Sequence, residues 1–377
     1  MAITSAPRPG NVDHERVTDA APVGPVRIPG TDAPLGEELL LCHDRASGLA
    51  AAIAVDDTTL GPGLGGVRWM PYPSLLAAVE EAARLSRVMT LKNALAEIPY
   101  GGAKSVLLRH GAAPDGPART AQLLAFARCV GRLGGAYVPG VDMGTSVADL
   151  AVIATVAPWV SCNHDDPSPA TARGVFHSLV AAVHRAGGTG DSRGTSLAGV
   201  HVAVQGAGHV GAVLCDLLAA RGARVTVADV DAGRAASVAR RVGGTVVAPG
   251  SVHRTPCDVF APCAAARVLQ AQSIGELRCA LVVGAANDVL ADRSCAGLLA
   301  RRGIVYVPDF VSNAGGVLQI HAERAGWDEA RLNDALAAVG RRTTALLDAA
   351  ASAGALPLEV AEQWASDRIG HPVTIPE

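Results

Sequence analysis

Two lysines stand out in this sequence as candidates for acid–base chemistry. The chain has 32 basic residues, and its only lysines are Lys92 and Lys104. Arginine keeps its proton in proteins, whereas a buried lysine can lose its proton and act as a base. The two lysines are 12 residues apart in a glycine-rich segment. We therefore interpret them as functional groups rather than as surface charges that remained by chance.

A second candidate site is a glycine-rich loop with the pattern G-x-G-x-x-G, which follows the β-branched run 201–205. Glycines in this pattern allow a tight turn and a close approach of the backbone to a pyrophosphate, and the helix that follows offers free N–H groups. Asp229, 23 residues after the first glycine, is placed to accept the ribose hydroxyls, which favours NAD over NADP. Asp231 is expected to cap the next helix. The cofactor-binding residues predicted here are Gly206, Gly208, His209, Val210, Gly211 and Asp229. The alternative is a plain glycine-rich turn with Asp229 as a helix cap.

The elements that must position these groups divide the chain in two. Strand-like runs at 38–42, 49–55 and 64–69 precede a helix that Ser74 begins and that ends close to Lys92. Gly101 and Gly102 are expected to break the chain before a strand at 105–108. From about residue 201, strands and helices alternate, which predicts a parallel, doubly wound sheet.

These patterns predict an α/β protein with a cleft between its two main domains. We expect a flexible tail at 1–36, a substrate-binding and oligomerisation domain at 37–164, and a Rossmann NAD-binding domain at 165–345. Helices in the last segment, 346–377, are expected to return to the first domain.

Several motifs, taken together, resemble the glutamate/leucine/phenylalanine/valine dehydrogenase family, most closely its leucine, valine and phenylalanine branch. Their order and spacing extend over about residues 39–345. The motifs are GPGLGGVR at 61–68, MTLKNA at 89–94, GGAK at 101–104, DMGT at 142–145, PSPATA at 167–172, FAPCA at 260–264, GAAN at 284–287 and PDFVSNAGG at 308–316.

The resemblance implies oxidative deamination of an L-amino acid to its 2-oxo acid and ammonia, and the reverse reaction. Lys92 would bind the substrate carboxylate. Lys104 would be a neutral base that activates water, with its pKa lowered by Lys92 and by a dry cleft. Asp142 would relay protons to the amino group. Further residues implied by the resemblance are Gly65, Gly66 and Asn313 close to the substrate, Asn287 between the substrate and the nicotinamide ring, and Thr171 and Ala286 in the cofactor site, with Thr171 beside the nicotinamide ring.

Some of these residues have structural alternatives. Asp142 could instead cap a helix that starts near Ser146. Asn287 and Asn313 lie beside Gly/Ala-rich turns, where asparagine is common for backbone reasons. The chain also departs from the family pattern at Val141, where an acidic residue is frequent, and at Asp288, where an amide is frequent.

The substrate side chain is expected to be apolar. Glutamate enzymes of the family use a further lysine near the Leu64 position, and this chain has no third lysine. Leu64, Val317 and Ile320 would instead line an apolar pocket, which favours a branched-chain amino acid. Gly140 could leave room for a ring, so phenylalanine or tryptophan is the alternative substrate.

Composition limits the partners. The formal net charge is −3 with no polybasic block, and no apolar run approaches the roughly 20 residues that span a bilayer. We expect a cytoplasmic enzyme that binds neither nucleic acid nor membrane and that forms a homo-oligomer, a dimer or larger. The eight scattered cysteines predict no metal site. The alternative from another class is a non-catalytic NAD-binding sensor.

Overall fold

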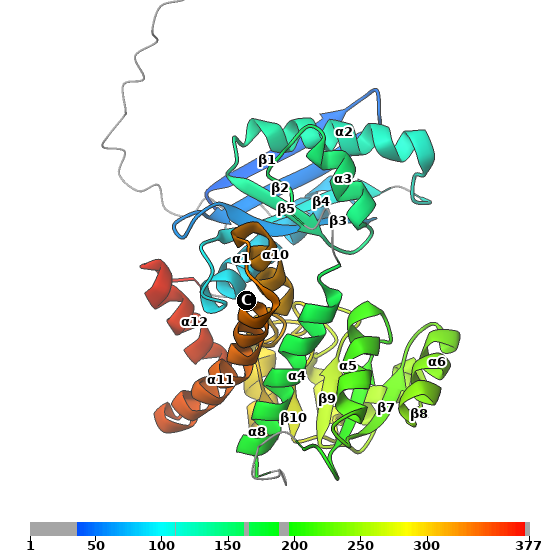
Figure 1. The fold of residues 1–377 in the computed structure, drawn as a ribbon, viewed down its shortest axis with the longest axis vertical. Coiled ribbons are helices and arrows are strands. Elements are labelled where there is room, and N and C mark those ends of the chain that lie inside the picture. The colour runs from blue at the N-terminus through cyan, green and yellow to red at the C-terminus, as the bar shows by residue number, and fades with distance from the viewer. Residues whose placement is uncertain (1–35, 110, 162–165, 188–195, 374–377) are drawn as a thin grey trace, which may run out of the picture.

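The computed structural model describes residues 36–109, 111–161, 166–187 and 196–373, and Figure 1 shows two α/β domains, one above the other. The predicted tail at 1–36 lies, except for Gly36, outside the described residues. The predicted boundary at 164 and 165 also falls outside them. In the described part of the chain, no helix is both long enough and apolar enough to cross a membrane.

The first domain is built on a five-stranded sheet with the order β1-β2-β4-β3-β5. Strands β1, β2 and β4 pair antiparallel, and β3 pairs parallel with both β4 and β5. The elements are β1 (Glu38–Asp44), β2 (Leu49–Asp57), β3 (Gly63–Pro71), α1 (Leu75–Leu95), β4 (Gly101–Arg109), α2 (Gly116–Arg132), β5 (Tyr137–Val141) and α3 (Val147–Ala154).

Both faces of this sheet are covered, which explains why β2 is an almost uninterrupted apolar run. Successive side chains of a strand point to opposite faces. Ala51 and Ile53 pack in a cluster with residues of α2 and α3, whereas Ala52 and Ala54 pack with residues of α1. Helix α1, which carries Lys92, therefore lies on the face of the sheet nearer the second domain (Figure 1).

The second domain holds a six-stranded parallel sheet with the order β11-β10-β9-β6-β7-β8. Counted from β6, this is the strand order of a Rossmann fold, as predicted. Its elements are α4 (Ser168–Arg185), β6 (His201–Gln205), α5 (His209–Ala219), β7 (Arg224–Ala228), α6 (Ala232–Val242), β8 (Thr245–Val246), the 3-10 helix η1 (Pro249–Arg254), β9 (Val259–Pro262), α7 (Ala271–Glu276), β10 (Leu281–Val282), α8 (Ser294–Arg301) and β11 (Val305–Tyr306).

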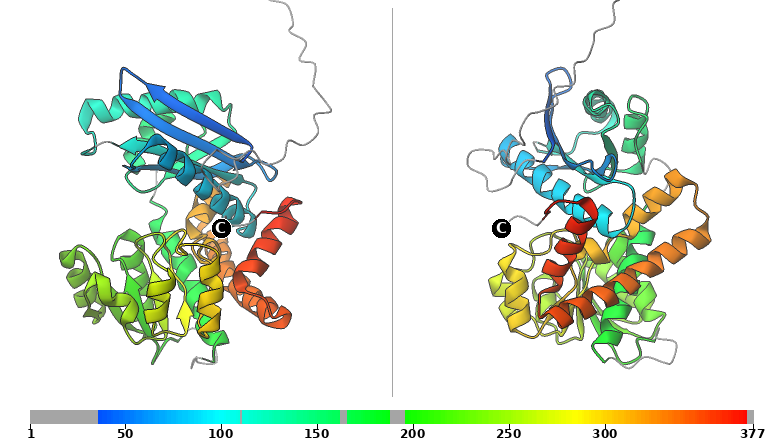
Figure 2. Two further views of the ribbon diagram at one scale, coloured as in Figure 1. Left: turned by 180° about the vertical axis from the view of Figure 1, so that it is seen from behind. Right: turned by 90° about the vertical axis from the view of Figure 1, so that its left-hand side faces the viewer.

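Four helices close the described chain: α9 (Asp309–Ser312), α10 (Gly315–Ala325), α11 (Glu329–Ala353) and α12 (Pro357–Ile369). Helix α11 packs against α4, and α12 packs against both α11 and α1. Figure 2 shows α12, in red, beside α1 of the first domain. The division predicted between residues 345 and 346 lies inside α11, which is a single continuous helix.

The expected chain break at Gly101 and Gly102 is wrong, because both glycines belong to β4. A Cβ atom on Gly102 would lie 2.2 Å from the backbone nitrogen of Thr90 in α1. Gly102 therefore allows α1 to pack closely on the strand that carries Lys104, whereas Gly101 allows close approach of Asp57 in β2.

Candidate active site

Helix α1 positions Lys92 in the cleft between the domains. The hydroxyl of Ser74 caps this helix by accepting the N–H of Ala77, as predicted. Lys92 is 5% exposed, and its Nζ donates a hydrogen bond of 2.6 Å to Oδ1 of Asn287. Asn287 lies in the loop that follows β10, so this bond joins the two domains. The side-chain amide of Asn313 donates to the same oxygen at 3.0 Å.

Lys104 and Asp142 form a buried ion pair on the first sheet. Nζ of Lys104 lies 2.6 Å from Oδ2 of Asp142. Lys104 is on β4 and Asp142 follows β5, and the two strands are separated by β3, where Gly66 is the register partner of Gly140 in β5. A Cβ atom on Gly66 would lie 2.7 Å from Cβ of Asp142 and 3.2 Å from Nζ of Lys104. The missing side chain at Gly66 is therefore what lets the lysine reach the carboxylate.

Gly65 has a packing role in addition to the expected place beside the substrate. A Cβ atom there would lie 1.6 Å from the carbonyl oxygen of Ala103, so this glycine permits close packing of β3 on β4. It also lines the cavity described below.

The expectation that Asp142 could be a helix cap is wrong. Ser146 caps α3, with its hydroxyl accepting the N–H of Asp149, and Asp149 closes the capping box. The carboxylate of Asp142 instead accepts charge-assisted bonds from Lys104 and from Nε of Arg68, the latter at 3.0 Å. Its own backbone N–H donates to the hydroxyl of Thr145.

Burial shifts the ionisation of these groups. Burial lowers the pKa of Lys104, while Asp142 opposes this shift and the positive charge of Arg68 adds to it. Burial also lowers the pKa of Lys92, to about 8, with Asp309 opposing and Lys104 contributing to the shift. Burial alone would raise the pKa of Asp142, but Lys104 and Arg68 hold it well below its usual value. A lysine with a lowered pKa, paired with a carboxylate whose pKa is also lowered, suits proton transfer.

The ion pair extends into a network that sequence reasoning missed. Arg68 also contacts Glu81 at 2.6 Å, Glu81 pairs with Arg84, and Arg84 pairs with Asp288 of the second domain. One signal was available. Glu81 precedes Lys92 by 11 residues, which in an α-helix is three turns and the same face.

One cavity of about 140 Å³ brings the predicted substrate residues together. Lys104, Asp142 and the predicted cofactor residue Thr171 line it as well. Its lining contains every residue predicted for the substrate: Leu64, Gly65, Gly66, Lys92, Asn287, Asn313, Val317 and Ile320. Met89, Pro167, Ala285 and Gly316 also line it and were not anticipated. Leu64, Met89, Val317 and Ile320 belong to one apolar cluster, so the cavity has an apolar wall as well as the two lysines.

The glycine-rich loop lies between β6 and α5, where each glycine meets a distinct requirement. Gly206 has φ +105°, a Cβ on Gly211 would lie 2.0 Å from the Gly206 carbonyl oxygen, and Gly208 faces open space. The open space at Gly208 and the N-terminus of α5 fit a pyrophosphate. The carboxylate of Asp229 accepts the N–H of Ala207 at 2.7 Å and ion-pairs with Arg234 at 2.9 Å. Asp231 caps α6 by accepting the N–H of Arg234, as predicted.

The remaining cofactor residues lie away from the lysine cavity. His209 is 86% exposed at the start of α5, beside Val210, and its ring lies 3.6 Å from the carboxylate of Asp166. Ala286 is buried next to Asn287 and does not line the cavity. Of the predicted cofactor set, Thr171 alone is part of the cavity lining.

A Rossmann sheet with this loop, facing a buried lysine–carboxylate pair across a cleft, defines a dinucleotide-dependent dehydrogenase. The family comparison is more specific. The dimerisation domain of Glu/Leu/Phe/Val dehydrogenases matches residues 39–157, and the Glutamate/Leucine/Phenylalanine/Valine dehydrogenase model matches residues 233–355. The chain belongs to this family.

Individual relatives agree with this assignment. The leucine dehydrogenase of Geobacillus stearothermophilus is 38% identical over 78% of this chain and 80% of that protein. The valine dehydrogenase of Streptomyces albus is 36% identical over 88% of this chain and 92% of that protein. The crystal structure of the L-tryptophan dehydrogenase of Nostoc punctiforme matches with a TM-score of 0.73 and 35% identity, covering 89% of this chain and 96% of that one.

Proposed function

We propose that this chain oxidises a branched-chain L-amino acid to its 2-oxo acid and ammonia with NAD, and catalyses the reverse reductive amination. The observation that carries the proposal is the composition of one cavity. Two buried lysines and Asp142 share it with the apolar side chains of Leu64 and Val317. An amino acid with an apolar side chain needs a cation for its carboxylate, groups that transfer protons at its amino group, and an apolar surface for its side chain.

Binding begins at Lys92. Its ammonium donates a hydrogen bond to Asn287, and the substrate carboxylate would take the place of that amide as its partner. Because the pKa of Lys92 is about 8, the side chain is charged at neutral pH and attracts the carboxylate. Asn313, which also donates to Asn287, would keep the displaced amide close to the nicotinamide.

Lys104 and Asp142 would then move protons. When bound, the dinucleotide accepts the hydride from the α-carbon of the substrate, which leaves an imine. Lys104, deprotonated, removes a proton from water as that water attacks the imine carbon. Asp142 relays this proton from Lys104 to the nitrogen, and ammonia leaves as the C–N bond breaks. The hydroxyl proton passes back to Lys104 as the carbonyl forms. The pair at 2.6 Å provides a direct route for this exchange.

The pocket argues against a glutamate substrate. A side-chain carboxylate in a buried cavity needs its own cation. The lysines that line this cavity are already assigned to the α-carboxylate and to the proton relay, and Leu64 stands where a further cation would be required.

An aromatic substrate is the second candidate. Gly140 lines the cavity and contributes no side-chain volume, which leaves room beside Val141 for a ring. The similarity of this chain to an L-tryptophan dehydrogenase supports keeping this candidate. A non-catalytic NAD-binding role is disfavoured because Lys92, Lys104 and Asp142 are all present and assembled.

NAD is the proposed cofactor because Asp229 follows β7 beside the glycine-rich loop. Its carboxylate would accept the ribose hydroxyls and repel a 2′-phosphate. Arg234 pairs with Asp229 and neutralises part of this charge.

We propose that the chain forms a homo-oligomer through contacts of its first domain. Strand β1 is at the edge of its sheet, and Leu41 on this strand is 53% exposed. Edge strands with exposed apolar side chains are common pairing surfaces. Light scattering coupled to size-exclusion chromatography would give the number of subunits.

A substrate screen tests the proposed function. NADH formation is measured with each of the twenty L-amino acids, and the reverse reaction with ammonia and the matching 2-oxo acids. Leucine, isoleucine and valine should give the highest kcat/KM. Higher values for phenylalanine or tryptophan would favour the aromatic candidate, and activity with none of the twenty would refute the enzyme assignment.

A further inference from the structure

Helix α9 holds the loop that carries Asn287. This loop, residues 284–288, follows β10 and lies beside the lysine cavity. The hydroxyl of Ser312 donates to the first carbonyl oxygen of the loop at 2.8 Å. At the other end of the loop, Oδ2 of Asp309 accepts the backbone N–H of Asp288. The first and last residues of one short helix therefore fix both ends of the loop.

Asp309 is a buried carboxylate that accepts a hydrogen bond on each oxygen. It is 3% exposed, and the phenol of Tyr306 in β11 donates to Oδ1 at 3.2 Å, while Asp288 donates to Oδ2. Hydrogen bonds donated to a carboxylate stabilise its ionised form, even where burial raises the pKa of the group, as it does here. Asp309 does not line the lysine cavity, so it would not touch a substrate bound there.

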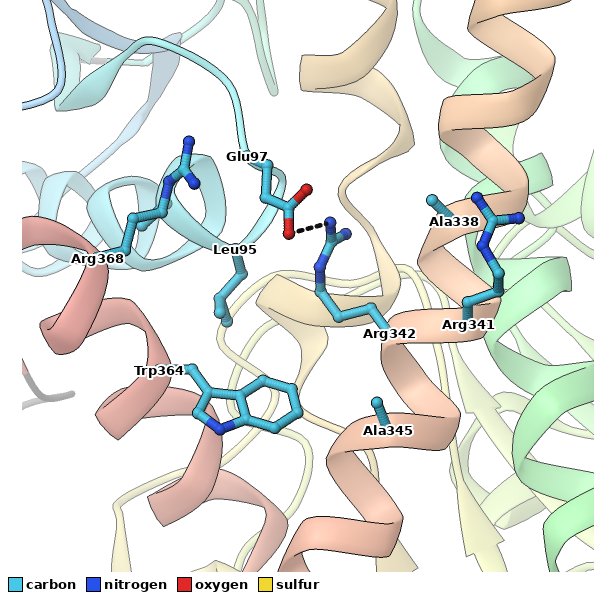
Figure 3. Close-up of a pocket in the computed structure, with 9 residues that line it drawn as sticks. Leu95, Glu97, Ala338, Arg341, Arg342, Ala345, Trp364 and Arg368 are labelled. Atoms are coloured by element: carbon cyan, nitrogen blue, oxygen red, sulfur yellow. Dashed lines mark ion pairs between the residues drawn. The ribbon is translucent and has the colours of Figure 1, made fainter.

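Helix α11 keeps Asp309 close to the helix of Lys92. Helix α9 packs against both α1 and α11. Just beyond the end of α1, Glu97 forms an ion pair of 3.3 Å with Arg342 of α11, as Figure 3 shows. The same helix therefore contacts the element that carries Asp309 and is paired to the element that carries Lys92.

The charge of Asp309 acts on Lys92. Burial lowers the pKa of Lys92 to about 8, and the negative charge that opposes this shift most strongly is Asp309. Lys92 in turn opposes the effect of burial on the pKa of Asp309. The two groups are thus a buried pair of opposite charge, with one member from each domain. Other titratable groups around this pair are Lys104 in β4, Asp142 after β5, Tyr306 in β11, Asp288 in the loop and Arg84 of α1, which pairs with Asp288.

We propose that Asp309 is a positioning residue, which keeps Lys92 charged and holds Asn287 against it without touching the substrate. Both effects serve the binding of the substrate carboxylate, since only the charged form of Lys92 attracts that carboxylate. Without the charge of Asp309, Lys92 would release its proton at a lower pH. The inference rests on the proposed function, because that function assigns the carboxylate to Lys92.

The charge of Lys92 can be measured without any activity, because the chain has only two lysines. The full chain is labelled with ¹³C in its lysine side chains, so that a pH titration by NMR follows two lysine signals, which Lys92→Arg assigns. Asp309→Asn keeps an oxygen for the N–H of Asp288 but removes the charge, so the pKa of Lys92 should fall by about one pH unit or more. Asp348→Asn removes an exposed carboxylate of α11 and is the matched control, which should leave the pKa of Lys92 unchanged.

Steady-state kinetics with the best substrate separate the charge of Asp309 from its hold on the loop. Asp309→Asn should raise KM more than it lowers kcat, and should move the alkaline limb of the kcat/KM profile to lower pH, because Lys92 loses its charge earlier. Ser312→Ala loosens the same loop without changing a charge, so it should raise KM and leave the profile in place. Asp309→Glu keeps the charge and should keep the wild-type profile.

The outcomes distinguish this inference from the proposed function. An inactive wild type would refute the proposed function, whereas the lysine titration would still measure the effect of Asp309 on Lys92. The inference is overturned if Asp309→Asn leaves the pKa of Lys92 where it is, or if Asp309→Glu lowers it equally. A wild-type pKa of Lys92 well below neutrality would also overturn it, and this measurement needs no variant to fold. NADH fluorescence titration checks that each variant is folded.

Discussion

Arg84 of α1 forms an ion pair with Asp288, the residue directly after Asn287 in the second domain. Through Glu81 and Arg68 this pair is connected to Asp142, so one chain of buried charges runs from the proton relay to the opposite side of the cleft. Asp288 holds a left-handed backbone with φ 54°. The relative position of the domains and the charge around Asp142 are therefore linked in this chain.

Asp288 should make stability depend on pH in a way that an amide does not. Burial raises its pKa to about 6, and the pairing with Arg84 only partly offsets this. The folded state thus holds a proton at Asp288 that the unfolded state has released above about pH 4, so stability falls as the pH rises through about 6. The Tm of Asp288→Asn, minus that of the wild type, should increase by a few degrees between about pH 4.5 and about pH 7. A constant difference would show that Asp288 ionises normally.

Lys104 should be irreplaceable as a base. Lys104→Ala removes the base, and Lys104→Arg keeps the charge in a group that cannot release its proton. Both variants should lower kcat by about a hundredfold or more with the best substrate. Most activity remaining in Lys104→Arg would assign the base elsewhere. Unchanged NADH binding serves as the control for folding.

Lys92 should act on both binding and pH dependence. Lys92→Ala should raise KM, because the carboxylate loses its cation, and should move the kcat/KM profile to higher pH. Removing a neighbouring positive charge raises the pKa of Lys104, which must be neutral to act. Lys92→Arg keeps the charge and should leave the profile in place. Identical profiles for the alanine variant and the wild type would exclude coupling between the two lysines.

Gly66→Ala and Gly65→Ala should impair the protein for different reasons. A methyl group at Gly66 meets the side chains of Asp142 and Lys104, whereas one at Gly65 meets the backbone of Ala103 at 1.6 Å. Gly66→Ala should therefore reduce kcat strongly with a moderate loss of Tm, and Gly65→Ala should mainly reduce Tm. Thermal unfolding and steady-state kinetics on both variants separate the two effects. If Gly66→Ala is nearly as active as the wild type, the lysine does not need that space.

Cofactor choice should depend on Asp229 and Arg234 together. The wild type should prefer NAD over NADP by about tenfold or more in kcat/KM. Asp229→Ser removes the repelling carboxylate and frees Arg234 for a 2′-phosphate, so the preference should shrink or reverse. The double variant Asp229→Ser, Arg234→Ala should lose this gain in NADP use. Equal use of both cofactors by the wild type would mean that Asp229 does not face the ribose.

Local patterns predicted much of the second domain. The β-branched run at 201–205 is a strand, and the helix expected after Asp231 begins at Ala232, because an apolar run and a capping residue are both local signals. Strand β5 and helix α10 were not anticipated. Pro139 and Gly140 interrupt β5, and α10 begins with Gly315 and Gly316, so local propensity argues against both elements.

The charge network could not be predicted in the same way. Apart from the helical spacing of Glu81 from Lys92, nothing in the sequence distinguishes Arg68, Glu81 and Arg84 from surface residues, and arginine is the common cation of this chain. Asp142 lies 74 residues after Arg68 and meets it through the pairing of β3 with β5, and Asp288 meets Arg84 only after the two domains pack together. Motifs identify groups that act on a substrate, whereas the groups that hold them in place are fixed by tertiary contacts.

The burial of both lysines has a consequence for covalent labelling. Apart from the α-amino group of the chain, Lys92 and Lys104 provide its only primary amines, and each is 5% exposed. Acylating reagents and amine-directed cross-linkers, which modify the surface of most proteins at many points, have no lysine target on the outside of this one. A small aldehyde or activated ester that enters the cleft would modify a lysine inside the cavity, and occupancy of the cavity by a ligand would protect both.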